Sequence, residues 1–229
     1  MTGSMSAARS GAQRWIVAVA VVALLAIVGA VDRDLLWLHY LCKPLATLLV
    51  MAMVIAGGGA RGRYGRAIVI GLVLSTLGDV FLMLPQASGG PDWFTFGLAS
   101  FLIAHVAYLV AFCGRARLFA AKLPFVVYAV LGGSVLAVLW PHLPGALRAP
   151  VVAYVLVLAT MAAQASVVWV RERDGASRMA ALGGAFFVAS DATLAIDRFV
   201  SPFPAAVVVV LATYWAAQAL IGLSATKGR

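Results

Sequence analysis

Residues 67–84 read AIVIGLVLSTLGDVFLML, an apolar run with a single ionisable side chain, Asp79. An α-helix rises 1.5 Å per residue, so a run of this length spans about 27 Å, close to the roughly 30 Å hydrocarbon core of a bilayer. A carboxyl group at such a depth is costly and usually marks a functional site. This stretch therefore predicts a transmembrane helix that contributes an aspartate to a site inside the membrane.

The composition of the whole chain extends this interpretation. Of 229 residues, 64% are hydrophobic and only 11% are charged, and the mean hydropathy is +1.02, whereas soluble domains are roughly half apolar and a quarter charged. We predict an all-α fold, a polytopic membrane bundle of about eight transmembrane helices in one domain over 14–223, between short basic tails at 1–13 and 224–229. The apolar runs of membrane length are 14–31, 35–56, 67–84, 94–113, 123–140, 150–170, 180–199 and 204–223.

The net charge of +9 is explained by membrane topology. Lys and Arg lie between the apolar runs instead of forming one patch, so binding to nucleic acid is not expected. The loops that carry Arg61, Arg115 and Arg173, and both tails, fall on one side if every run spans, while alternate loops such as Pro85 to Asp92 carry little positive charge. The positive-inside rule then places both termini in the cytoplasm. We expect a multi-pass protein of the cell membrane, the inner membrane of a bacterium.

The first apolar run has an alternative interpretation. Arg9 and Arg14, the apolar stretch and the small residues Gly29 and Ala30 also resemble a cleavable signal peptide. The stretch is longer than the usual apolar region of about 7–15 residues, which favours a span. Its removal would leave seven spans in the same orientation.

Polar residues of five different runs share one depth. Counted from the outer end of each run at 1.5 Å per residue, the depths are about 7 Å for Asp79, about 12 Å for Lys43 and Asp191, about 13 Å for Ser75, about 15 Å for Tyr214 and about 16 Å for His105. Scattered structural residues have no reason to share a depth. We therefore predict one site in the outer half of the membrane.

Several of these residues also have structural interpretations, which the sequence leaves open. A serine such as Ser75 commonly hydrogen-bonds its own helix backbone, and Lys43 could extend its stem toward the interface. Tyr108 shares a helix face with His105, and Gln218 with Tyr214, as expected for a cavity lining or for ordinary interhelical contacts. Asp197 and Arg198, near the outer end of the seventh run, are interpreted as an interfacial charge pair.

Other chemistries lack their usual signatures. Zinc hydrolases present at least three N, S or O ligands, yet His39 and His142 lie near run ends and only His105 lies deep, so no metal is expected. There is no Gly-x-Ser-x-Gly elbow, phosphate loop or dinucleotide fingerprint, and therefore no cofactor is expected. Any chemistry must rest on carboxylates.

The same residues carry a resemblance to a known family. They lie in Lys43-Pro44, in Ser75-Thr76-Leu77-Gly78-Asp79 running into Phe81-Leu82-Met83, in Gly97…Phe101…Ala104-His105…Tyr108, in Phe186…Ser190-Asp191…Leu194 and in Tyr214…Gln218. This pattern resembles the YhhN family, whose characterised members are lysoplasmalogenases. The resemblance implies an eight-span hydrolase that cleaves the vinyl ether bond of a lysoplasmalogen, a lysophospholipid, into a fatty aldehyde and a glycerophospho-base. The family has been placed near membrane hydrolases that bind zinc through several histidines, a pattern from which this chain departs.

The implied substrate fits the residues. A vinyl ether is cleaved by protonation on the carbon remote from oxygen, addition of water and collapse of the hemiacetal, which requires a carboxylic acid and an anion that stabilises the cation. Asp79 and Asp191 are predicted as acid and counter-charge, in an order that the sequence does not assign. His105 would orient or deprotonate the water, and Lys43 would meet the lipid phosphate or pair with an aspartate. The residues predicted to bind substrate are Lys43, Ser75, Tyr108, Ser190, Tyr214 and Gln218.

A proton-coupled transporter that uses the same Asp and His residues is the alternative. Broken helices would favour it, but no run has a central Gly-Pro break and no convincing inverted repeat is present. The hydrolase is therefore preferred. The sequence indicates neither the lipid head group nor the oligomeric state.

Overall fold

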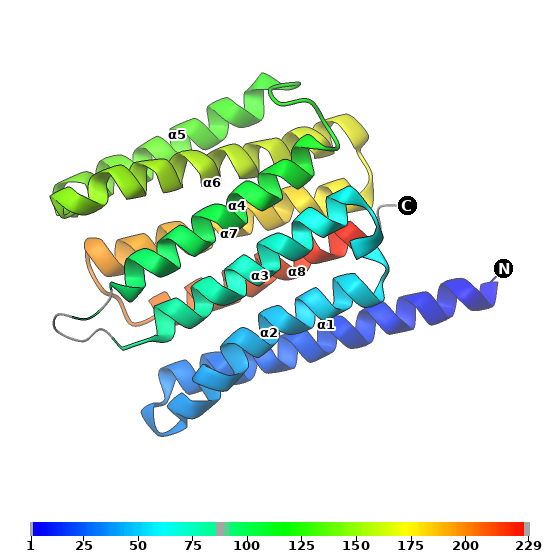
Figure 1. Ribbon diagram of the computed structural model, residues 1–229, viewed down its shortest axis with the longest axis horizontal. Coiled ribbons are helices and arrows are strands. Elements are labelled where there is room, and N and C mark those ends of the chain that lie inside the picture. The colour runs from blue at the N-terminus through cyan, green and yellow to red at the C-terminus, as the bar shows by residue number, and fades with distance from the viewer. Residues whose placement is uncertain (1, 86–89, 91, 227–229) are drawn as a thin grey trace.

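The protein is described by a computed structural model over residues 2–85, 90 and 92–226. Within these residues it contains eight α-helices and no strand (Figure 1), and all eight helices are long and apolar enough to cross a membrane. The predicted all-α, eight-helix bundle is confirmed. The helices are α1 (Thr2–Val31), α2 (Leu36–Ala56), α3 (Arg63–Met83), α4 (Trp93–Cys113), α5 (Lys122–Leu139), α6 (Gly145–Glu172), α7 (Gly175–Phe199) and α8 (Ala206–Thr226).

Several helices extend beyond the apolar runs at the end that carries the basic loops. α3 begins at Arg63 rather than residue 67, and α7 begins at Gly175 rather than residue 180. Hydropathy detects the segment inside hydrocarbon, whereas a helix continues until its backbone is capped. For α7 that cap is Asp174, whose side chain accepts a 2.6 Å hydrogen bond from the backbone N–H of Ser177 in a capping box.

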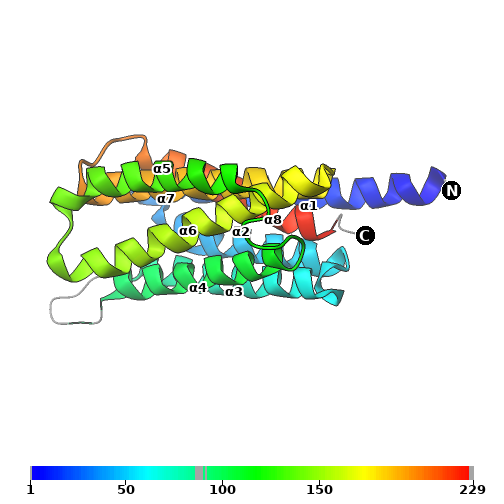
Figure 2. The same cartoon turned by 90° about the horizontal axis from the view of Figure 1, so that it is seen from above.

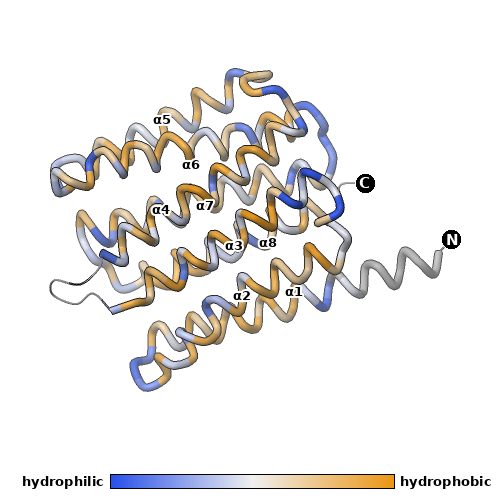
Figure 3. The backbone as a smooth tube through the Cα atoms, viewed as in Figure 1, coloured by the Kyte–Doolittle hydropathy of each residue, from blue (hydrophilic) through white to orange (hydrophobic). Residues whose placement is uncertain are grey.

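Successive helices run up and down, so the basic loops collect at one end of the bundle. The α2–α3, α4–α5 and α6–α7 connections lie at the same end as the start of α1 and the end of α8, on the right in Figure 1, and each of these three connections contains hydrophilic residues in Figure 3. This is the arrangement that the loop charges predict. Part of the predicted outer loop, residues 86–89 and 91, lies outside the described residues, and so does part of the predicted C-terminal tail, residues 227–229.

The middle of the bundle is occupied by α6 and α8, each of which contacts several other helices. Seen from above, α3 and α4 lie along one side of the bundle and α5 and α7 along the other (Figure 2). Between them, α6 contacts α4, α5 and α7, and α8 contacts α3 and α7 as well as α1 and α2. α5 is peripheral, with Leu139 as its only buried residue.

Glycines allow α3 and α4 to approach closely. A Cβ added at Gly78 would lie 2.7 Å from the ring of Phe101, and a Cβ added at Gly71 would overlap the ring of Tyr108. Small residues at helix contacts permit such packing in membranes. The two glycines are one heptad apart, and this contact sets the position of Asp79, which follows Gly78.

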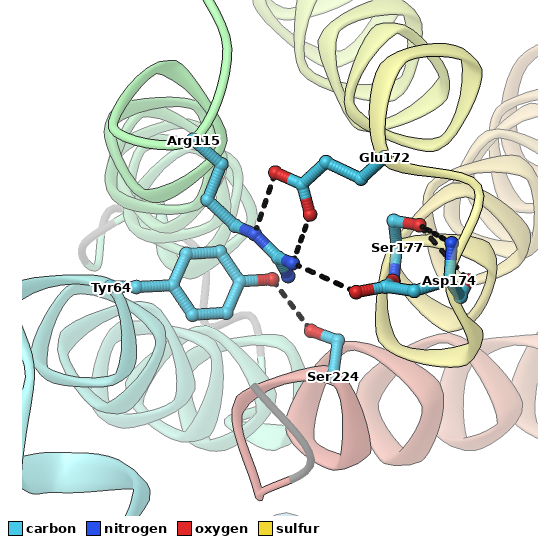
Figure 4. Close-up of polar contacts among 6 residues, drawn as sticks. All are labelled: Tyr64, Arg115, Glu172, Asp174, Ser177 and Ser224. Carbon is cyan, nitrogen blue, oxygen red and sulfur yellow. Dashed lines mark hydrogen bonds and ion pairs between the residues drawn. The ribbon is translucent and has the colours of Figure 1, made fainter. Parts of the chain in front are cut away.

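A polar network closes the end of the bundle that carries the basic loops (Figure 4). The guanidinium group of Arg115 forms an ion pair with Glu172, lies 3.6 Å from the Asp174 carboxylate and stacks 5.1 Å above the centroid of the Tyr64 ring. The Tyr64 hydroxyl lies 2.6 Å from the Ser224 hydroxyl. One arginine therefore links α3 and the ends of α4 and α6, and through Tyr64 the network reaches α8.

Candidate functional site

A cavity of about 330 Å³ lies in the half of the bundle away from the basic loops. It reaches the end of the bundle among Leu84, Phe94, Leu139 and Phe199 and extends inward between α3, α6, α7 and α8. Its wall as a whole is mostly apolar, and its volume falls in the range of small-molecule sites. The polar side chains that line its interior are Lys43, Asp79, Tyr128, Tyr154, Ser190, Asp191 and Tyr214.

Asp79 is the most strongly bonded carboxylate of the cavity. Only 1% of the residue is exposed, and its Oδ2 accepts hydrogen bonds from the hydroxyl groups of Tyr214 at 2.6 Å and Thr47 at 3.1 Å. Nζ of Lys43 lies 3.6 Å from its Oδ1. Of the two roles predicted for Lys43, the structure contains the pairing with an aspartate. A buried cation and two hydroxyl donors together stabilise a carboxylate at this position.

Asp191 faces the same cavity with fewer donors. The hydroxyl group of Tyr154 donates a 2.6 Å hydrogen bond to its Oδ2, and Nε2 of His105 lies 4.0 Å from the same atom. No Lys or Arg of the described residues forms an ion pair with it. The two carboxyl groups are close enough to interact electrostatically, yet their partners differ.

His105 lies behind Asp191 and is not part of the cavity wall. It is fully buried, its ring contacts Phe187 edge-on at 4.6 Å between centroids, and neither ring nitrogen has a hydrogen-bond partner in the described part of the chain. A separation of 4.0 Å between His105 Nε2 and Asp191 Oδ2 is too long for a direct hydrogen bond.

Three other predicted residues support the site from behind. The hydroxyl group of Tyr108 donates a 2.7 Å hydrogen bond to Oε1 of Gln218 and lies 3.5 Å from the Ser75 hydroxyl. None of the three lines the cavity. Ser190 does line it, but its hydroxyl group donates to the Val210 carbonyl at 3.1 Å. The predicted residues are therefore brought together, with the cavity wall formed by only some of them.

Sequence analysis missed Thr47, Tyr154 and Phe187. Thr47 lies four residues after Lys43 and so shares its helix face, a signal that was available. Tyr154 is one turn inside the sixth apolar run, at a depth close to that of Asp79, and extending the depth count to every tyrosine would have included it. Phe187 carries no polar signal and is identified only by its contacts with His105 and Tyr214.

The metal donors of the described residues do not converge. No group of three or more His, Cys, Asp or Glu side chains among them could hold a metal ion. The several histidines of zinc-binding membrane hydrolases therefore have no counterpart around His105, and these side chains do not fit such a metal centre.

Comparison with known proteins gives consistent matches. The sequence profile of the YhhN family matches residues 38–225. Lysoplasmalogenase TMEM86B of Sus scrofa is 38% identical over 187 residues, which cover 81% of this chain and 74% of that protein. Lysoplasmalogenase TMEM86A of Bos taurus is 36% identical over 165 residues, 71% of this chain and 66% of that protein. A lysoplasmalogenase of Mycobacterium tuberculosis is 30% identical over 203 residues, 83% of this chain and 73% of that protein. No solved structure matches.

Proposed function

This chain belongs to the YhhN family, and we propose that it is a membrane-embedded lysoplasmalogenase that hydrolyses the vinyl ether bond of lysoplasmalogens. Relatives named lysoplasmalogenase cover most of the chain. The observation that carries the mechanism is the pair of aspartates on one cavity, of which Asp79 has a lysine partner and Asp191 has no Lys or Arg partner among the described residues. This difference supports an assignment of roles that the sequence leaves open.

In the proposed mechanism Asp191 is the acid. Its carboxylic acid transfers a proton to the vinyl carbon remote from oxygen, and the electron pair of the double bond forms the new C–H bond. The positive charge then lies on the oxygen-bearing carbon as an oxocarbenium ion. Asp79, kept as a carboxylate by Lys43, Tyr214 and Thr47, stabilises this cation electrostatically.

Water completes the reaction. It adds to the oxocarbenium carbon and releases a proton to the Asp191 carboxylate, which restores the acid. In the resulting hemiacetal the bond to the glycerol oxygen then breaks, the hydroxyl proton passes to that oxygen and the hydroxyl oxygen forms the carbonyl group, which gives the fatty aldehyde and the glycerophospho-base. His105 acts through Asp191, because its Nε2 approaches that carboxyl group and not the cavity. It is proposed as a positioning residue that holds the orientation of the Asp191 carboxyl group.

The apolar lining of the cavity between α5 and α6 suits the hydrocarbon chain of a single-chain lipid. Its apolar arm passes Tyr128, Gly132 and Val135 of α5 and Val155 and Ala159 of α6. We propose that the alkenyl chain lies along this arm while the head group stays at the mouth. With the basic loops in the cytoplasm, the mouth faces the outer side of a bacterial inner membrane.

The test is an assay of the purified protein in detergent. Aldehyde release is measured from lysoplasmalogens of several head groups and from ester lysolipids of matched chain length. Release from the vinyl ether lipids alone is the expected result, with loss in Asp191→Asn and retention in Asp197→Asn. Asp197 is a matched control, since its side chain accepts a hydrogen bond from Phe203 outside the cavity wall. A folded protein that releases no aldehyde would overturn the proposal and direct attention to proton-coupled transport.

A further inference from the structure

Arg198 occupies the mouth of the cavity. It lies in the last turn of α7, and its guanidinium carbon stacks 4.3 Å from the centroid of the Phe94 ring, with both residues lining the cavity. A guanidinium on an aromatic face is held in position while its N–H donors remain available. Arg198 is therefore a fixed cation at the point where a lipid head group would lie.

No carboxylate of the described residues forms an ion pair with Arg198. Asp197, its expected partner in an interfacial charge pair, instead accepts a 3.0 Å hydrogen bond from the backbone of Phe203. Asp92 is close enough to interact electrostatically with Arg198, but its oxygens accept from the backbone N–H of Thr95 at 3.2 Å and the Thr95 hydroxyl at 2.5 Å. The guanidinium group thus retains donors for a ligand.

The spacing between Arg198 and Asp191 matches the proposed substrate. Seven residues make two helical turns, so the two residues share one face of α7 and are separated by about 10 Å along the axis. In a lysoplasmalogen, seven bonds join the vinyl carbon that Asp191 would protonate to the phosphorus, a reach of roughly 9 Å for bond lengths near 1.5 Å. The difference between this reach and the axial separation of Arg198 and Asp191 is shorter than an extended arginine side chain.

The other cations near this end of the bundle are either paired with a carboxylate or lie outside the cavity lining, as Arg33 does in the turn between α1 and α2. Lys43 pairs with Asp79 inside the cavity. Arg148 stacks 4.9 Å from the centroid of the Trp140 ring and does not line the cavity. Among the described residues that line the cavity, Arg198 is the cation left for an anionic group.

We propose that Arg198 binds the phosphodiester of the substrate head group and so selects phospholipid-derived vinyl ethers over neutral ones. This proposal rests on the proposed function and names the part of the substrate that the enzyme recognises. An arginine forms paired charge-assisted hydrogen bonds with phosphate oxygens. Because the phosphate takes no part in bond cleavage, its binding places the vinyl ether against Asp191.

The experiment varies the residue and the substrate together. Arg198→Gln, Arg198→Lys and the control Arg148→Gln are each assayed with a lysoplasmalogen and with the 1-alkenylglycerol of the same chain, which lacks the phosphate. Arg198→Gln is expected to lower kcat/KM for the lysoplasmalogen by about 10- to 100-fold and to leave the alkenylglycerol unchanged. Arg198→Lys keeps the charge and should lose less, and Arg148→Gln should change neither substrate.

The outcomes separate this proposal from its alternatives. If Arg198 only anchors the protein to bulk lipid phosphate or stabilises the end of α7, Arg198→Gln will affect both substrates equally or neither, which overturns the assignment. If the wild type cleaves neither substrate while its melting temperature shows that it is folded, the proposed function itself fails. Equal loss in Arg198→Gln and Arg148→Gln would also contradict a specific role for Arg198.

Discussion

The Tyr154 hydroxyl donates a 2.6 Å hydrogen bond to Asp191, the same length as the hydrogen bond from Tyr214 to Asp79. Each aspartate of the cavity thus has a tyrosine partner from another helix. The pairs differ in their further partners, because Lys43 and Thr47 contact Asp79, whereas His105 lies 4.0 Å from Asp191. The position of one cation therefore distinguishes the proposed counter-charge from the proposed acid.

We expect Asp79→Asn and Asp191→Asn each to lower kcat by roughly 100-fold or more, because each removes a group that acts on the charge of the transition state. The double variant should be little worse than the worse single one, since members of a catalytic unit are not additive. The kcat of these three variants is measured from steady-state aldehyde release.

Turnover of the wild type should also slow in deuterated water, because carbon protonation limits the chemical step.

Folding must be controlled in these variants. Asp79→Asn leaves Lys43 without its partner and is expected to lower the melting temperature more than Asp191→Asn, which leaves no buried cation behind. Full activity in a well-folded Asp191→Asn variant would rule out Asp191 as the acid.

Tyr154→Phe keeps the ring and removes the hydrogen bond to Asp191. Loss of one such bond should reduce kcat roughly 10-fold, corresponding to about 1.4 kcal/mol. The control is Tyr40→Phe on α2, whose side chain is exposed and outside the cavity. Equal kinetics of the two variants would assign Tyr154 a packing role only.

The orientation of the bundle can be tested by cysteine labelling. In a background with Cys42 and Cys113 replaced by Ser, an impermeant thiol reagent added to intact cells should modify Ser201→Cys but not Arg61→Cys, Arg117→Cys or Arg171→Cys. All four positions are exposed at the ends of the bundle, and the positive-inside rule assigns the arginines to the cytoplasm. Labelling of the three arginine positions from outside would reverse the proposed topology.

Gly71→Ala should destabilise the protein through the α3–α4 contact. The new Cβ would overlap the Tyr108 ring, and overpacking of this kind costs about 1–3 kcal/mol. Gly133→Ala is the matched control, because no atom lies within 4 Å of its added Cβ. Thermal unfolding in detergent should give a lower melting temperature for Gly71→Ala than for Gly133→Ala. An unchanged melting temperature in Gly71→Ala would mean that α3 and α4 can move apart with little loss of stability.

Asp174 should make stability depend on pH. Hydrogen bonds from the Ser177 backbone and then from its side chain lower the pKa of the Asp174 carboxyl. A group with a lowered folded-state pKa stabilises the fold above its ordinary value of about 3.9 and loses this contribution as pH falls through the folded value. The melting temperature of the wild type should therefore exceed that of Asp174→Asn at pH 7, and the difference should disappear in acid. A difference that is constant with pH would show that the charge is not involved.

Depth along the chain predicted which residues converge, but not their partners. Asp79, Lys43 and Tyr214 have similar predicted depths and do meet in the structure. Depth is one coordinate only, and the partner of Lys43 depends on which helices are neighbours and how each is rotated. The aspartates were identified because burying a carboxyl group in a membrane has a high free-energy cost. A phenol such as Tyr154 has a much lower cost and therefore gives no such signal.

The helix ends show a similar limit. Residues 67–84 identified the span of α3, but the helix begins at Arg63 because the hydrocarbon boundary and the helix boundary are set by different forces. Likewise, adjacency suggested a pair between Asp197 and Arg198, yet neighbours on a helix point in different directions.

Because α5 is peripheral, the length of the alkenyl chain that the cavity accepts can change in evolution independently of the residues proposed to cleave the vinyl ether. This helix forms part of the apolar arm through Tyr128, Gly132 and Val135, yet it contributes one buried residue to the bundle and neither of the aspartates. Substitutions along it can widen, narrow or shorten the arm without disturbing Asp79 or Asp191. Homologues that act on alkenyl chains of different length are therefore expected to diverge in α5 while their acid and counter-charge remain the same.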